Sequence, residues 1–441
     1  MKKLVLLILL LAVFVFPLAA YAGTEYAIKE VQVVNNDKLS EDEILRLVPE
    51  LKAGKNADIK KVSEQVQLAN TSNNVKLNVN LVPVGGEYIA KITVQEGEKD
   101  FVFTSIENTG NDYTGKSRLV LGYVDNNLSG KQDLFGLTAV TSPDKMDKML
   151  QLGAFYRVLL PKQGDSMYFT ASYADSKLGI VQEYSGFGNL SAKGKGYAVG
   201  SHYVHNVRLL PNERANLDFG IDYTSYKNNT DLNILGVTLP SHTKVNALKA
   251  SLTWNQSKSL ENQAWAYSLG ISQNLKGDEE EYQLARYGSE DKFTILTGSF
   301  NYKAKTKSDW MICASAFGQY TNDDLVYQEQ MSLGGMYTVR GFKQDIIQGD
   351  KALCGKLEIY TPEFAKNQRL LAFYDIGTVK NNHVLNPGEL SSETISGAGI
   401  GWRYTDSKNG LSIGLDYGFA LKEPGFDADN GRGYFSVMKK F

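Results

Sequence analysis

Residues 215–224 read ANLDFGIDYT, and residues 411–420 read LSIGLDYGFA, so apolar and polar or small side chains alternate along both stretches. A period of two is that of a β-strand with one apolar and one polar face. Runs of about ten residues are longer than an average soluble strand and can cross a tilted path through a bilayer. In lipid, only a closed barrel pairs every backbone group of such strands, so the pattern predicts a transmembrane β-barrel.

The same period continues from Phe101 to the C-terminus, which allows the strands to be counted. An even number, about 16 antiparallel strands, fits a bacterial outer-membrane barrel. We place them at residues 102–109, 117–125, 131–142, 147–159, 165–177, 194–208, 213–227, 243–256, 262–275, 292–304, 309–321, 351–362, 369–378, 394–405, 410–420 and 432–441.

The connections between these strands fall into two classes. Those after even-numbered strands have about four to six residues, whereas most of those after odd-numbered strands have about eleven to sixteen. The connection at residues 321–350 is the longest, with nearly thirty residues. Short turns on one side and long loops on the other are typical of outer-membrane barrels, whose short turns are periplasmic.

The first residues predict export. Lys2 and Lys3 precede an apolar run, residues 4–16, and Ala20-Tyr21-Ala22 forms a small-x-small cleavage pattern. The run is too short for a transmembrane anchor, so we interpret residues 1–22 as a signal peptide. The mature chain would then begin at Gly23, and the export route leads to the outer membrane of a bacterium with two membranes.

Residues 23–98 form a separate segment whose order is strand, helix, helix, strand, strand. Ser40 and Glu43 form a capping box before the first helix, Asp58 can cap the second, and Gly85-Gly86 turns the chain between the last two strands. This βααββ order predicts a small periplasmic α+β domain with an edge strand able to accept another chain. Residues 99–441 would form the barrel.

Several classes of function find no support in the sequence. A Walker A, HExxH, GxSxG or CxxC pattern does not occur, so we predict no enzyme, no cofactor and no metal site. His202 and His205 are three apart on a strand and point to opposite faces. A net charge of -2 neither implies nor excludes a polyanionic partner, but the sequence has no basic stripe with interleaved aromatics, so we predict no nucleic-acid partner. Cys313 and Cys354 differ in height on their strands, so we expect both to be free thiols.

Two short motifs connect the barrel to a known family. The long loop contains Leu333-Gly334-Gly335-Met336-Tyr337-Thr338-Val339-Arg340-Gly341-Phe342, and the thirteenth strand contains Phe373-Tyr374-Asp375-Ile376-Gly377. These stretches resemble the VRGF/Y loop motif and the FxDxG strand motif of the Omp85 superfamily. The resemblance implies that the loop folds back into the barrel and that Arg340 pairs with lumenal Asp375. The motif residues are Val339, Arg340, Gly341 and Phe342 in the loop, Phe373, Asp375 and Gly377 on the strand, and Phe441 as the aromatic end of the last strand.

Within this superfamily, the N-terminal segment resembles a POTRA domain of two-partner secretion transporters, the TpsB proteins of the ShlB/FhaC/HecB haemolysin secretion/activation type. This resemblance implies a monomeric outer-membrane pore that translocates an unfolded TpsA-like exoprotein to the cell surface. The exoprotein would bind the POTRA domain by β-augmentation. Members of the family usually carry a plug helix and two POTRA domains, whereas this sequence has room for one POTRA domain and no plug, which leaves gating open.

Two other functions fit the same architecture. An Omp85 assembly or insertion factor of the BamA/TamA type would share both the barrel and the POTRA domain. A diffusion porin would share the barrel alone and would not explain the POTRA domain or the paired motifs.

Overall fold

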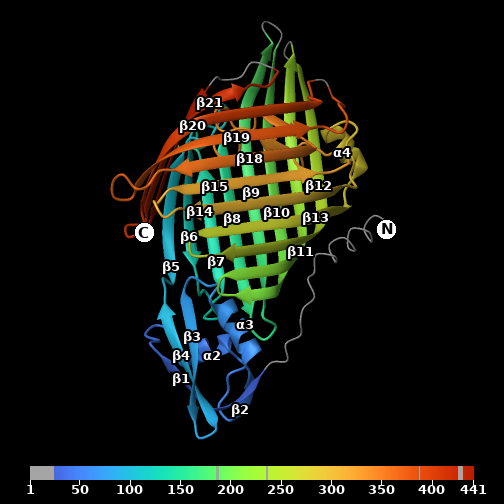
Figure 1. Cartoon of the computed structure of the whole chain (residues 1–441). Coiled ribbons are helices and arrows are strands. Elements are labelled where there is room, and N and C mark those ends of the chain that lie inside the picture. Colours follow the sequence, from blue (N-terminus) through green and yellow to red (C-terminus); the bar gives the residue numbers. More distant parts are fainter. Residues whose placement is uncertain (1–23, 185–187, 235–236, 387, 426–430) are drawn as a thin grey trace.

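A computed structural model describes residues 24–184, 188–234, 237–386, 388–425 and 431–441. It consists of a closed barrel of sixteen antiparallel strands and a small N-terminal α+β domain below it (Figure 1). Both parts of the predicted fold class are therefore confirmed. The predicted signal peptide, residues 1–22, lies outside the described residues. Among those residues, no helix has the length and apolar character needed to cross a membrane.

The small domain has one strand more than the predicted βααββ order. Its sheet has the strand order β2-β1-β4-β3. The additional strand, β2, has the sequence KNAD and pairs with residues 25–28 of β1. Four residues without apolar alternation give no strand signal, and pairing with β1 makes this segment a strand. The elements are β1 (Glu25–Val34), α2 (Glu41–Leu47), β2 (Lys55–Asp58), α3 (Ile59–Ala69), β3 (Val75–Val84) and β4 (Glu87–Glu96).

Both helices begin at the predicted caps. Ser40 accepts from the backbone of Glu43 while the Glu43 carboxylate accepts from the Ser40 backbone, which completes the capping box. Asp58 accepts from two backbone N–H groups at the start of α3. The helices bury one face each against the sheet, with Ile44 and Val62 among the buried residues.

The sixteen barrel strands overlap the predicted ones throughout. The first and last strands, β5 and β22, pair antiparallel and close the barrel. The strands are β5 (Asp100–Glu107), β6 (Arg118–Asp125), β7 (Leu134–Thr141), β8 (Met149–Leu160), β9 (Asp165–Tyr184), β10 (Gly188–Leu210), β11 (Glu213–Ile234), β12 (Val237–Ser259), β13 (Gln263–Lys276), β14 (Thr294–Lys305), β15 (Met311–Tyr320), β18 (Lys351–Tyr360), β19 (Gln368–Lys380), β20 (Ser392–Asp406), β21 (Leu411–Lys422) and β22 (Gly431–Lys440).

Four of the predicted loops contain regular structure. Strands β9 to β12 continue through most of residues 178–193 and 228–242, where the sequence predicts loops. Polar and small residues follow one another in these extensions, as in NNTD at residues 228–231 and SAK at residues 191–193, so the apolar period of a membrane strand is interrupted there. A short helix, α4 (Glu279–Ala285), lies between β13 and β14. The longest loop contains a small hairpin of β16 (Met331–Leu333) and β17 (Ile347–Gly349).

The side chains of the barrel wall point outward or into the lumen as the alternation predicts. Phe219 and Ile221 on β11 and Tyr417 on β21 are exposed on the outside of the barrel. Asp416, which precedes Tyr417 on β21, is buried on the lumenal side. The outer surface is therefore the apolar one, as a membrane-spanning barrel requires.

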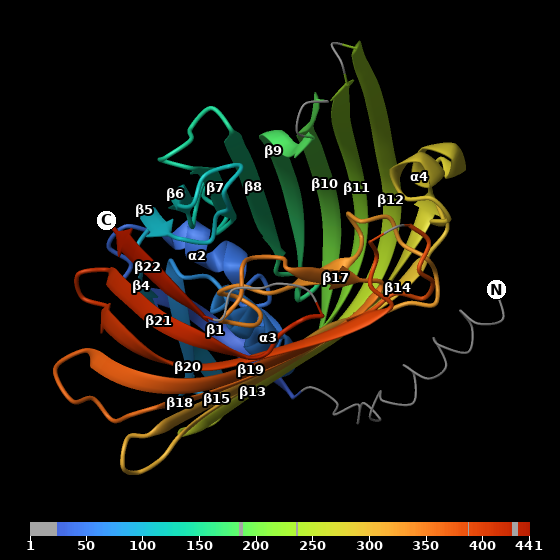
Figure 2. The same ribbon diagram turned by 90° about the horizontal axis from the view of Figure 1, so that it is seen from above.

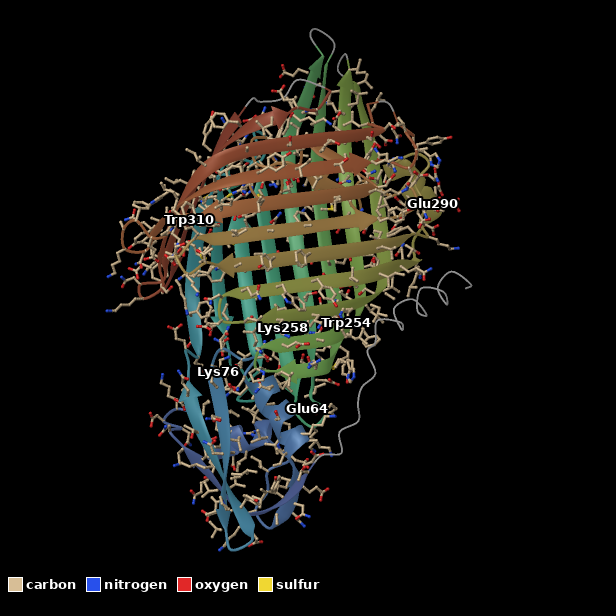
Figure 3. All side chains as sticks on the ribbon, in the orientation of Figure 1. Glu64, Lys76, Trp254, Lys258, Glu290 and Trp310 are labelled. Carbon is tan, nitrogen blue, oxygen red and sulfur yellow. The ribbon has the colours of Figure 1, made fainter. Side chains whose placement is uncertain are left out.

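The small domain is packed against the short turns of the barrel. Leu159 and Leu209, at the ends of β8 and β10 next to two such turns, belong to the same buried cluster as the core of the domain. Asn74 donates to Gln132 at 3.1 Å, which joins the two parts through side chains. Lys76 and Glu64 lie where the small domain meets the barrel, whereas Glu290 beside α4 lies on the barrel farther from the domain (Figure 3). The domain thus marks the periplasmic end of the barrel.

Candidate functional site

The lumenal face of β19 is the floor of the candidate site. Phe373, Asp375 and Gly377 alternate with outward-facing residues and are buried, as the period of two predicts. Asp375 is 0% exposed. A fully buried carboxylate is stable only with a positively charged or hydrogen-bonding partner, so the neighbours of this residue define the site.

The partner comes from the loop between β15 and β18, which folds back into the barrel. Seen from above, β17 lies inside the ring of strands (Figure 2). Val339 and Phe342 are fully buried in a cluster with Leu333 and Ile347 of the small hairpin. The cluster also includes wall residues of β18, β19 and β20, namely Ala352, Cys354, Val379 and Ile395. This apolar contact holds the loop against one side of the wall.

Arg340 is the polar centre of the folded-in loop and is only 1% exposed. Its Nε and Nη2 atoms donate to the two oxygens of Asp375 at 2.7 and 3.0 Å, in the fork geometry that only arginine offers. The backbone N–H of Arg340 also donates to Asp375 at 3.2 Å. The guanidinium lies over the ring of Phe373, 3.5 Å from its centroid, so the phenylalanine of the strand motif stacks on the arginine of the loop motif.

Two further carboxylates surround Arg340. Its Nη1 atom lies 2.7 Å from Glu358 on β18 and 3.2 Å from Asp416 on β21. Arg403 on β20 donates to both oxygens of Asp416. The sequence interpretation did not single out Glu358 or Asp416, although the alternation of β21 already put Asp416 on the lumenal face. Breaking a buried ion pair of this kind by removing one partner costs about 3 to 5 kcal/mol.

Glycines on the wall let the loop approach the strands closely. A Cβ atom on Gly397 would lie 1.9 Å from the carbonyl oxygen of Arg340, and one on Gly418 would lie 2.6 Å from the backbone nitrogen of Gly341. Gly341 itself has φ +106°, which L side chains rarely adopt. The glycine of the loop motif is therefore required by its backbone conformation as well as by the space beside β21.

The loop also contacts both strands that close the barrel. On β22, the Tyr434 hydroxyl donates to the carbonyl oxygen of Phe342 at 2.6 Å and accepts from Gly341 N–H. On β5, Glu107 accepts a hydrogen bond from the Tyr337 hydroxyl. The loop motif therefore bridges the junction at which the first and last strands of the barrel meet.

Of the remaining residues singled out by the sequence, Cys354 belongs to the apolar cluster that holds the motif loop, and the others lie apart from it. Phe441 follows β22 and is 71% exposed. Cys313 and Cys354 are both free thiols, as expected. His202 contacts Asp218 and Asp222, whereas His205 contacts a different carboxylate, Asp165. Within the described ranges no group of three or more His, Cys, Asp or Glu side chains could hold a metal ion.

A second buried arginine, Arg286, lies at the extracellular mouth, and the sequence offered no signal for it. It follows α4, and its side chain is 0% exposed. Its Nε and Nη2 atoms donate to Glu389 at 2.8 and 3.0 Å. Its Nη1 atom donates to the Leu325 carbonyl oxygen at 2.7 Å and lies 3.3 Å from Asp350. One guanidinium thus joins the loops at residues 277–293, 321–350 and 381–391.

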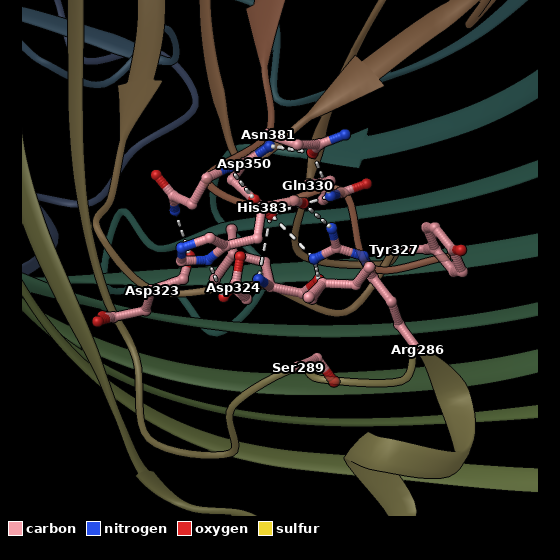
Figure 4. Close-up of polar contacts among 12 residues, drawn as sticks. Arg286, Ser289, Asp323, Asp324, Tyr327, Gln330, Asp350, Asn381 and His383 are labelled. Carbon is pink, nitrogen blue, oxygen red and sulfur yellow. Dashed lines mark hydrogen bonds and ion pairs between the residues drawn. The ribbon is translucent and has the colours of Figure 1, made fainter. Parts of the chain in front are cut away.

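Further polar contacts connect these three extracellular loops (Figure 4). Gln330 donates to Asp350 and to Asn381 at 2.9 Å each. His383 lies 2.9 Å from Asp324. Burial alone would raise the pKa of Glu389, but its hydrogen bonds with Arg286, the Leu385 backbone, Asn386 and Tyr327 lower that pKa from 4.5 to about 2. The Glu389 carboxylate is therefore charged at neutral pH, as its pairing with Arg286 requires.

A transmembrane barrel with a POTRA-like domain and an arginine-bound loop in its lumen is an outer-membrane protein of the Omp85 superfamily. Residues 86–404, more than half of the chain, match the haemolysin secretion/activation proteins ShlB/FhaC/HecB. The chain belongs to this family. Its barrel lies in the outer membrane, with the small domain in the periplasm.

Known relatives agree with this assignment. The heme/hemopexin transporter protein HuxB of Haemophilus influenzae is 24% identical over 365 residues, 81% of this chain and 62% of HuxB. This chain therefore spans less than two thirds of the length of that relative. Among solved structures, CdiB from Escherichia coli is similar in fold, with a TM-score of 0.72 at 16% identity over 97% of this chain and 93% of CdiB. BamA from Haemophilus ducreyi lacking POTRA domains 1–3 has a TM-score of 0.59 at 15% identity, over 96% of this chain and 86% of BamA.

We predict that Arg340→Lys changes the single-channel conductance of the purified barrel in planar bilayers. A lysine keeps the charge but cannot bind both oxygens of Asp375, so the loop loses its fixed position and conductance becomes larger and noisier. Arg208→Lys is the matched control, because Arg208 is half exposed near the periplasmic end of β10, away from the motif loop. Wild-type conductance in Arg340→Lys would show that the forked ion pair does not hold the loop.

A second prediction concerns acid. Because the pKa of Glu389 is lower in the folded protein than its ordinary value of 4.5, its contribution to loop packing is complete above that value. The contribution is lost as the pH falls from 4.5 towards about 2, so we expect channel opening to increase across this window. Glu389→Gln should already open more at neutral pH and show a smaller acid response. Glu363→Gln, in a periplasmic turn, should behave as wild type, and an acid response unchanged by Glu389→Gln would contradict the prediction.

Proposed function

We propose that this chain is the outer-membrane pore of a two-partner secretion system, which translocates an unfolded TpsA-like exoprotein from the periplasm to the cell surface. The observation that carries the proposal is the loop bound through Arg340 inside the barrel of a ShlB/FhaC/HecB family member. A plain diffusion porin would explain neither the paired motifs nor the periplasmic domain. We include in the proposal that the protein acts as a monomer.

The exoprotein is recognised by the periplasmic domain, which we assign to residues 23–98. Beyond Ile28, no described strand pairs with the free edge of β1, since β2 covers only residues 25–28. A groove of about 780 Å³ lies beside this edge and is lined by Val31 of β1 and by Leu45 and Arg46 of α2. An extended peptide can pair with the free backbone groups and insert alternate side chains into the groove.

The barrel then provides the route across the membrane. The motif loop and its carboxylate partners shape one side of the lumen, so the translocated chain passes along a polar, hydrated wall. Folding of the exoprotein on the outside gives the direction, because a folded domain cannot return through the pore. The chain needs no nucleotide for this process.

The experiment is a secretion assay in a strain in which the gene has been deleted. Deletion should remove one or a few exoproteins from the cell surface while the amounts of other outer-membrane barrels stay unchanged. The wild-type gene should restore secretion. Leu45→Glu should not, because it replaces an apolar contact surface of the groove by a further negative charge beside Glu41 and Asp42.

Lys61→Glu is the matched control, because Lys61 is an exposed residue of α3 outside the groove. Both variants must show the heat-modifiable migration of a folded barrel. A general decline of outer-membrane barrels after deletion would instead support an assembly factor of the BamA/TamA type. Full secretion by Leu45→Glu would refute recognition in the groove.

A further inference from the structure

A groove of about 740 Å³ crosses the outer surface of strands β13, β14, β15, β18 and β19. Its floor consists of two glycines that face each other in register, Gly298 on β14 and Gly318 on β15. Leu269 and Leu353 flank the glycines and are about half exposed. The groove therefore lies on the lipid-facing side of the wall and has the apolar lining that an acyl chain requires.

Two lysines stand directly opposite each other at the extracellular end of this groove. Lys351, the first residue of β18, pairs in register with Lys380, the last residue of β19. Both face outward, because Ala352 and Val379 beside them are buried on the lumenal side. Like charges directly opposite each other on antiparallel strands repel and destabilise the pair.

No carboxylate within the described part of the chain offsets this repulsion. Neither lysine makes an ion pair with a carboxylate there, and the groove has no acidic residue in its lining. The Lys351 ammonium group lies 4.7 Å from the centroid of the Tyr320 ring, and Tyr320 is half exposed on the same outer face. Tyrosine and lysine at the end of a transmembrane strand mark the level of the lipid headgroups.

We propose that this groove binds lipid A of the outer leaflet, with one phosphate between Lys351 and Lys380 and an acyl chain over Gly298 and Gly318. The long loops identify this end of the barrel as extracellular, and lipid A is the phosphate-bearing lipid of that leaflet. Two ammonium groups can share one phosphate, which turns their repulsion into attraction. The proposal is independent of the secreted substrate.

The inner side of the same wall gives the site a structural role. Ala352 and Val379, which neighbour the two lysines in sequence, belong to the cluster that holds Val339 and Phe342 in the lumen. A lipid bound outside thus braces strands β18 and β19 where the motif loop packs against them.

The test is native mass spectrometry of the full-length protein in detergent, titrated with lipid A. The wild type should retain one lipid A, and Lys351→Ala with Lys380→Ala should reduce the apparent affinity roughly tenfold to hundredfold, since two charge-assisted hydrogen bonds are lost. Lys366→Ala with Lys408→Ala, in periplasmic turns, removes the same charge elsewhere and should bind as the wild type does. Gly298→Leu, whose Cβ has room, should also weaken binding by filling the groove.

Dephosphorylated lipid A provides a comparison on the wild-type protein alone, so the test does not depend on folding of any variant. It should bind as weakly to the wild type as lipid A binds to the double-alanine variant. Equal binding of lipid A and its dephosphorylated form would overturn the proposal. The proposal would also be overturned if phosphatidylglycerol bound to the wild type as tightly as lipid A does. An equal loss of lipid A affinity in the Lys351/Lys380 and Lys366/Lys408 double-alanine variants would overturn it as well.

Discussion

A guanidinium buried inside a protein needs acceptors for its N–H groups, and Arg340 finds carboxylates on β18, β19 and β21. This requirement constrains the barrel as much as the loop. A slip of one residue in the register of β19 would turn Asp375 towards lipid and leave the arginine without its main partner. The loop and the strand register therefore fix each other, and the contacts of Tyr337 and Tyr434 extend this constraint to the strands that close the barrel.

The two buried arginines fix loops at two levels of the pore, one in the lumen and one at the extracellular mouth. Arg340 holds the motif loop against the wall in the lumen, whereas Arg286 holds three extracellular loops together at the mouth. Both levels belong to the same chain segment, because residues 321–350 contribute Arg340 to one cluster and Asp350 to the other. In the proposed function, a chain that leaves the pore passes both clusters.

Much of the fold could be predicted from the sequence, because a period of two sustained over ten residues is typical of a membrane-crossing strand and each strand adds to the count. The pairing of Arg340 with Asp375 could also be predicted, but only because two motifs resemble those of a known superfamily. The other contacts of Arg340 could not be predicted. Glu358 resembles any other charged residue in a barrel lumen, and Gly397 becomes necessary only when the loop lies against it. The Arg286 cluster joins residues from three loops that carry no period, so only the folded chain reveals it. The extended hairpins of β9 to β12 were missed because polar residues on both faces resemble a loop.

The central claim is that Arg340 and Asp375 hold the loop in the lumen as one unit. A double-mutant cycle measures this directly, with the free energy of unfolding in urea determined for the wild type, Arg340→Ala, Asp375→Ala and the double variant in lipid vesicles. We expect the two single changes to be strongly non-additive, with a coupling energy of roughly 2 to 3 kcal/mol. Additivity to within about 0.5 kcal/mol would show that the two residues act independently and would contradict the account.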